Sequence, residues 1–157
     1  MKPLVLLLAM LGAASAHAVD VSTEINVENV LQLMNEYRAQ QSLPPLQHDR
    51  DLAKAAEDRM RDMEDGGWWN HESPEGMSPF IWLRVRNYDY AFAGENLANG
   101  FETAQLLVES WMESKGHREN ILGVQFHDCG IAIIDGSTKG PMVGKSVVVL
   151  FARRNSR

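Results

Sequence analysis

The chain has 157 residues, a single cysteine and a formal net charge of −6 at neutral pH with the histidines uncharged. This acidic balance argues against nucleic acid and anionic lipid as partners, because both require a basic surface. One cysteine cannot form a disulfide within the chain. We expect this thiol, Cys129, to be a small buried hydrophobe, because it lies beside an apolar run.

The first 18 residues are typical of a cleavable signal peptide. Lys2 gives a positive start, residues 4–11 are an apolar run, and Ala16-His17-Ala18 supplies small residues at the cleavage site. The run is too short to span a bilayer, so we expect a protein that is not embedded in a membrane. Residues 19–157 are predicted to form one exported domain, periplasmic or extracellular, whose net charge becomes −7 once Lys2 is removed.

Two helices are predicted first. Residues 27–41 place apolar side chains on one face at helical spacing, and Asn26 precedes them as a potential N-cap. Residues 49–65 form the second helix, which ends at a pair of glycines, and Arg59 and Arg61 are predicted to face outward. Its inward face is predicted to consist of Leu52, Ala55, Ala56, Met60 and Met63.

The middle of the chain is predicted to be less regular. Residues 68–71 are short and aromatic, which indicates an extended stretch in which Trp69 and His71 share a face. Ser78-Pro79 predicts a short helix over residues 80–87. Residues 88–101 contain two glycines and are predicted to be an ordered loop. A fourth helix follows over residues 102–115 and is predicted to end at Gly116.

The last third of the chain has the composition of β-strands. Residues 130–135 and 145–152 are β-branched and apolar, and the glycine-rich stretch between them indicates an antiparallel hairpin. Residues 147–151 are apolar at every position, which requires that both faces of that strand be covered. We therefore predict an α/β fold in which helices cover both sides of a central strand.

Residues able to do chemistry lie where the regular patterns break. No Gly-x-Ser-x-Gly elbow, phosphate loop or dinucleotide fingerprint occurs in the chain. His71-Glu72 begins like a zinc-peptidase His-Glu-x-x-His helix, but position 75 is Glu and Pro74 would obstruct the helix. We reject that mechanism, which leaves His71, Glu95 and His117 as the candidate set.

Two neutral imidazoles and a carboxylate can bind a divalent ion such as zinc and leave a coordination position for water. Magnesium or calcium would prefer more oxygen ligands than this set offers. The alternative is that the cluster only satisfies its own hydrogen bonds. We expect no obligatory cofactor, with His71 and His117 as the ligands if zinc binds. Trp69 is predicted to contact a ligand through the face it shares with His71.

Four segments of the chain are recognisable motifs: Leu33 to Arg38, His71 to Gly76 (HESPEG), Gly94 to Ala98 (GENLA) and Trp111 to Leu122 (WMESKGHRENIL). They resemble the CAP superfamily, which comprises cysteine-rich secretory proteins, antigen 5 proteins and plant pathogenesis-related proteins, and in particular its bacterial SCP-like branch. The resemblance implies a three-layer α-β-α sandwich with a small, mainly antiparallel central sheet. It also implies that His71, Glu95 and His117 line a central cleft.

The chain departs from the eukaryotic members of that superfamily at two points. Many of them carry a second cleft glutamate where this chain has Ser114, with Glu113 beside it. They also carry several disulfides, which this chain cannot form.

Three functions are compatible with these residues. The leading hypothesis is binding of a small ligand, a lipid or a peptide in a cleft formed by His71, Glu95, His117, Trp69, Asn96 and Ser114. The second is a hydrolase or peptidase in which a metal held by the two histidines activates water and Glu95 is the general base. The third is a non-catalytic interaction module of the cell envelope. No residue arrangement compels a nucleophile, so binding is favoured over catalysis.

Overall fold

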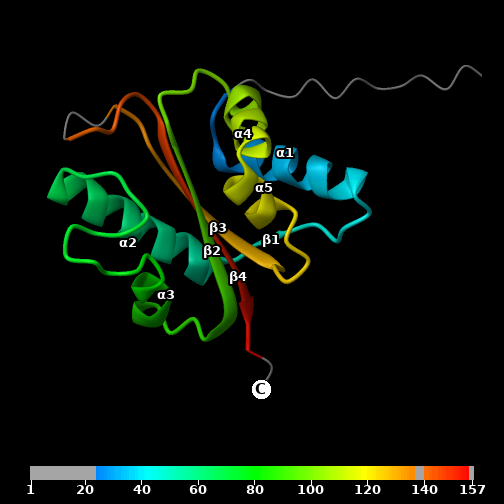
Figure 1. Cartoon of the computed structure of the whole chain (residues 1–157), viewed down its shortest axis with the longest axis horizontal. Helices are drawn as coiled ribbons and strands as arrows, with labels where there is room; N and C mark the ends of the chain where they lie inside the picture. Colours follow the sequence, from blue (N-terminus) through cyan, green and yellow to red (C-terminus); the bar gives the residue numbers. More distant parts are fainter. Residues whose placement is uncertain (1–23, 137–139, 156–157) are drawn as a thin grey trace, which may run out of the picture.

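The computed structural model describes residues 24–136 and 140–155, and the predicted signal peptide lies outside them (Figure 1). Four strands form one sheet in the order β1-β3-β4-β2, with β1 parallel to β3 and the other pairs antiparallel. Their bounds are β1 Gln47–His48, β2 Tyr90–Asn99, β3 Asp128–Ile134 and β4 Ser146–Arg154. The predicted hairpin is confirmed as β3 and β4, although residues 137–139 of its connection are outside the described residues.

Helices cover both faces of this sheet (Figure 1). One face carries α2 (Arg50–Gly66) and α3 (Ile81–Val85), and the other carries α1 (Val27–Gln40), α4 (Ala104–Glu113) and α5 (Lys115–Ile121). The predicted α-β-α sandwich with a mainly antiparallel sheet is therefore confirmed. Within the described part of the chain, none of the helices has both the length and the apolar character needed to cross a bilayer.

Strand β4 explains why five consecutive residues are apolar. Val147, Val149 and Phe151 pack into the core beneath α1, α4 and α5, whereas Val148 and Leu150 pack into the core beneath α2. Because successive side chains of a strand point to opposite faces, a strand between two helical layers needs apolar residues at every position.

Local signals correctly placed the starts of the first two helices. The side chain of Asn26 accepts a hydrogen bond from the backbone of Asn29, and Asp49 caps α2 in the same way. The five residues predicted to face inward on α2 are all buried, and so is Cys129. Burial raises the pKa of the Cys129 thiol to about 12.

Arg59 corrects the prediction for the outer face of α2. Its side chain is 1% exposed, whereas that of Arg61 is 61% exposed as predicted. Arg59 lies seven residues after Leu52 and four before Met63, which places it on the inward face of the helix. The prediction was wrong because it followed the charge of the residue rather than its position. A charge is buried here because partners for it lie beneath the helix.

Strand β2 corrects a second prediction, since residues 88–101 were expected to be a loop. Gly94 lies in the middle of the strand, and a Cβ atom there would come within 2.6 Å of Asn120 Oδ1 and 3.1 Å of Phe126 Cζ. The glycine therefore marks a close approach of α5 and the following segment to the strand. The adjacent Glu95 and Asn96 further obscure the apolar pattern, because both are polar and buried.

Smaller differences concern the ends of elements. The break between α4 and α5 lies at Ser114, whose backbone is extended. The break was predicted at Gly116 with His117 after it, but both residues are inside α5. Helix α3 is shorter than predicted, and Phe80 provides no side-chain cap. Residues 68–71 are irregular and pair with no strand of the sheet. Strand β1 was not predicted, because two residues are too short to give a pattern.

Candidate functional site

The candidate site lies at the β2 edge of the sheet, where the loop that follows α2 comes close to α5. Strand β2 pairs with β4 along one side only. Adjacent side chains of a strand point to opposite faces. Glu95 accordingly contacts Arg59 of α2, and Asn96 contacts residues of α5. One dipeptide of the edge strand thus supplies a polar group to each layer.

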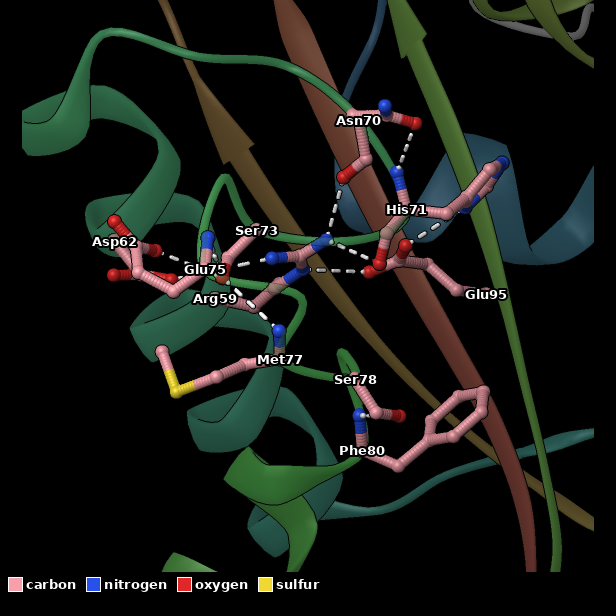
Figure 2. A network of polar contacts seen from close by, with 10 residues as sticks. All are labelled: Arg59, Asp62, Asn70, His71, Ser73, Glu75, Met77, Ser78, Phe80 and Glu95. Carbon is pink, nitrogen blue, oxygen red and sulfur yellow. Dashed lines mark hydrogen bonds and ion pairs between the residues drawn. The ribbon is translucent and has the colours of Figure 1, made fainter.

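Glu95 joins the strand to His71. One carboxylate oxygen, Oε1, lies 2.8 Å from His71 Nδ1, and the other, Oε2, accepts a hydrogen bond of 2.9 Å from Arg59 Nε (Figure 2). The Glu95 side chain is 2% exposed, whereas that of His71 is 53% exposed. Because an ionised carboxylate can only accept hydrogen bonds, the pairing assigns the proton of neutral His71 to Nδ1. The Nε2 lone pair of His71 is then available to a ligand.

His117 lies beside His71, although it comes from the opposite helical layer. The ring centroids of the two histidines are 6.2 Å apart, and the His117 ring is 6.3 Å from that of Trp111. Burial, together with the charge of His71, lowers the pKa of His117. Its imidazole is therefore neutral at neutral pH, which is the form that binds metal ions.

Asn96 holds α5 in place. It is fully buried, its Nδ2 donates to the backbone oxygen of His117 at 3.1 Å, and its Oδ1 accepts from Asn120 Nδ2 at 2.9 Å. Sequence reasoning grouped Asn96 with the ligand contacts and did not single out Asn120. The observed hydrogen bonds show that both amides help to fix where His117 lies.

Side chains of the helices also cover the open edge of β2. Asn120 Nδ2 donates to the backbone oxygen of Glu95 at 3.0 Å, and Trp111 Nε1 donates to that of Leu97 at 3.0 Å. Backbone groups alternate sides along a strand, so the oxygens of these two residues share a side. Two acceptors of the edge are thereby satisfied within the molecule.

Arg59 is the site residue that sequence reasoning missed. Besides its ion pair with Glu95, its Nη2 donates to the backbone oxygens of Asn70 at 2.6 Å and His71 at 3.0 Å (Figure 2). Its guanidinium carbon also lies 4.7 Å from the ring centroid of Trp68. The helical position of Arg59 was a usable signal, but its hydrogen-bond partners are 11 to 36 residues away and no local pattern links them.

The two remaining predicted residues lie around this centre. Trp69 is partly buried and lines a separate hollow of about 430 Å³ together with Trp68, on the loop that also carries His71. Ser114 is exposed at the N-cap position of α5, and its side chain makes no capping hydrogen bond there.

The donor set restricts what metal could bind. Within residues 24–136 and 140–155, no group of three or more His, Cys, Asp or Glu side chains is arranged to hold a metal ion. His71 Nε2 and the His117 imidazole would be the donors to a metal ion here, and Glu95 would orient His71 as carboxylates orient ligating histidines. Two protein donors are fewer than the three of a catalytic zinc site or the four of a structural one.

The three-layer sandwich, with two histidines and a glutamate at one sheet edge, is the arrangement that the resemblance to the CAP superfamily implied. The chain belongs to the cysteine-rich secretory protein family, CAP, whose family model matches residues 31–150.

Three bacterial proteins resemble the chain. It is 38% identical over 111 residues to protein YkwD of Bacillus subtilis, and the match covers 71% of this chain and 43% of YkwD. An extracellular SCP-domain protein of Bacillus anthracis is 28% identical, with a TM-score of 0.68 over 81% of this chain and 40% of that one. An outer surface protein of Borrelia burgdorferi shares the fold at 21% identity, with a TM-score of 0.70 over 83% of this chain and 97% of that one. The chain thus spans less than half of these two Bacillus relatives.

Proposed function

We propose that this protein is an exported CAP-domain protein that binds a small ligand, a lipid or a peptide segment in the cleft that the family resemblance implies around His71, Glu95 and His117. The observation that carries the proposal is the His71–Glu95 contact of 2.8 Å beside the His117 ring. A buried carboxylate orients a half-exposed imidazole, so a polar group is held ready at the surface. Export is supported by the predicted signal peptide and by the Bacillus anthracis relative, which is described as extracellular.

Zinc is the ion that this cleft would bind. His71 Nε2 and His117 would be its ligands, and Glu95 would act through His71. Bound zinc would supply a Lewis acid for a carbonyl or phosphate oxygen of the ligand.

A hydrolase is the second candidate, and the His71–Glu95 pair favours it. A carboxylate hydrogen-bonded to one ring nitrogen orients a histidine as general base, with the other nitrogen facing the substrate. Both oxygens of Glu95 are already engaged, by Arg59 and His71. The proton-accepting role therefore falls to His71 Nε2 in this proposal, rather than to Glu95.

Calorimetric titration of the mature protein tests the binding proposal. The probes are zinc chloride, phosphatidylcholine vesicles and a synthetic peptide library, applied to the wild type and to His71→Ala and His117→Ala. We expect zinc binding that weakens at least about tenfold in each variant. His127→Ala is the matched control, because His127 is exposed and lies outside the site, and it should leave the titration unchanged.

Two other results would favour one of the alternative functions. If the wild type binds none of the three probes, cleft binding is refuted and an envelope interaction module becomes the better description. Cleavage within the peptide library that disappears in His71→Ala would establish the hydrolase.

A further inference from the structure

Among the residues that the structure describes, two arginines are buried, one on each side of the sheet, and their partners differ in kind. Arg38 of α1 donates to the backbone oxygens of Pro44, Ile121, Gly123 and Phe126. These partners are all main-chain groups away from the site. Arg59 of α2 instead divides its donors between the Glu95 carboxylate and the backbone of the loop that carries His71.

The guanidinium of Arg59 holds both halves of the His71–Glu95 pair. Nε binds the carboxylate of Glu95 at 2.9 Å, and Nη2 binds the backbone oxygens of Asn70 and His71 (Figure 2). The group is planar and rigid, so these donors keep fixed directions relative to one another. The position of the irregular loop that carries His71 is thereby fixed relative to the strand that carries Glu95.

We infer that Arg59 is the positioning residue of the candidate site and that it sets which nitrogen of His71 faces a ligand. Arg59 holds Oε2 of Glu95 and the backbone oxygen of His71 in one fixed geometry, so Oε1 faces His71 Nδ1 and requires a proton there. His71 then presents the lone pair of Nε2. This inference rests on the proposed function only for what Nε2 binds, since the tautomer itself is a property of the unliganded protein.

Two substitutions separate this role from plain structural support. Arg59→Lys keeps the charge but replaces the planar guanidinium with an ammonium group. A single ammonium nitrogen cannot donate to Glu95 and to both backbone oxygens in one fixed geometry. Glu95→Gln keeps the volume and turns its carbonyl oxygen toward Arg59 Nε. The amino group of the new amide must then face His71 Nδ1, which has to accept, so the His71 proton moves to Nε2.

The test is to record the ¹⁵N chemical shifts of the His71 ring without any ligand, at a pH where the ring is neutral. We expect the Nδ1–H tautomer in the wild type, a mixture of tautomers in Arg59→Lys and the Nε2–H tautomer in Glu95→Gln. Arg61→Lys, on the same helix but exposed, should match the wild type. In zinc titrations of the same proteins, Arg59→Lys should reduce the affinity for zinc by about tenfold or more, whereas Arg61→Lys should not.

Each outcome decides the inference. An unchanged Nδ1–H tautomer in folded Arg59→Lys would overturn it, and so would retention of that tautomer in Glu95→Gln. If Arg59→Lys does not fold, Glu95→Gln decides, because it preserves the hydrogen bond to Arg59. A set of proteins that shows the expected tautomers but binds no zinc would refute the zinc site while leaving the role of Arg59 intact.

Discussion

His117 shows how a single side chain makes this fold sensitive to pH. Burial, followed by the charge of His71, lowers its pKa in the folded protein. The unfolded chain, where a histidine titrates near about 6.5, therefore binds a proton more readily than the folded protein. As the pH falls below that value, protonation favours the unfolded chain, and the stability present at higher pH is progressively lost.

We therefore expect the urea midpoint to be constant between about pH 7 and 8 and to fall as the pH drops from about 6.5 toward 5. His117→Asn removes the titrating group and should flatten part of this slope. His127→Asn, on an exposed residue, should not. A slope identical in wild type and His117→Asn would show that other groups cause the pH dependence.

The sequence identified the acidic and imidazole groups of the site but not the residues that hold them. His71, Glu95 and His117 lie in recognisable motifs, so residue types and resemblance sufficed to group them. Arg59 and Asn120 act through partners distant in the sequence, such as Glu95, which lies 36 residues from Arg59. Only the packing of α2 and α5 against β2 brings those partners together.

At the scale of elements, the contact between α2 and β3 depends on Gly130. A Cβ atom at this position would collide with the backbone of Leu52 and Ala53. Backbone cannot move aside as a flexible side chain can, so Gly130→Ala should displace α2. We expect a loss of about 1 to 3 kcal/mol in the free energy of unfolding, measured by urea denaturation.

Gly116→Ala is the matched control for this substitution. Gly116 is inside α5, and a Cβ atom there meets no other atom within 4 Å. Alanine favours the helix over glycine, so the same change should stabilise the protein by about 0.5 to 1 kcal/mol. Equal effects of the two substitutions would contradict the packing argument.

Elements with a simple periodic pattern were predicted well, and those shaped by close contacts were not. The patterns of α1, α2, β3 and β4 follow from one apolar face or, for β4, two. In β2, a glycine and two buried polar residues occupy the centre of the strand because α5 and Arg59 contact it there. Those contacts are tertiary, and no window of β2 alone contains them.

At the scale of the whole molecule, Arg38 links the first helix to the end of α5 and the segment that follows it. Its four backbone acceptors are contributed by Pro44 and by the stretch from Ile121 to Phe126. Arg38→Met preserves much of the packing but removes four hydrogen bonds, three of which are to buried backbone oxygens. We expect a loss of roughly 2 to 5 kcal/mol in the free energy of unfolding, with one cooperative transition that moves to lower urea concentration.

Arg61→Met provides the comparison for Arg38→Met, because its side chain is exposed, and it should change the free energy of unfolding by no more than about 0.5 kcal/mol. A similarly small effect for Arg38→Met would show that water replaces the lost donors.

The α-β-α architecture was predictable because two independent signals agreed. The wholly apolar β4 requires cover on both faces, and the motif resemblance implied the same three layers. The position of β2 at the edge, with the site beside it, could not be derived from either signal. Strand order depends on which partner each strand finds after the chain folds, and the short parallel strand β1 gives no sequence pattern at all.

The side chains of Asn120 and Trp111 along β2 bear on how copies of this protein meet one another. The unpaired backbone groups of an edge strand can pair with a strand of a neighbouring molecule, which is one way in which folded proteins begin to aggregate. Here two acceptors of the edge strand β2, the backbone oxygens of Glu95 and Leu97, already accept hydrogen bonds from an amide and an indole of the same molecule. A second copy that arrives at this side finds these two acceptors taken, so it has fewer groups with which to extend the sheet.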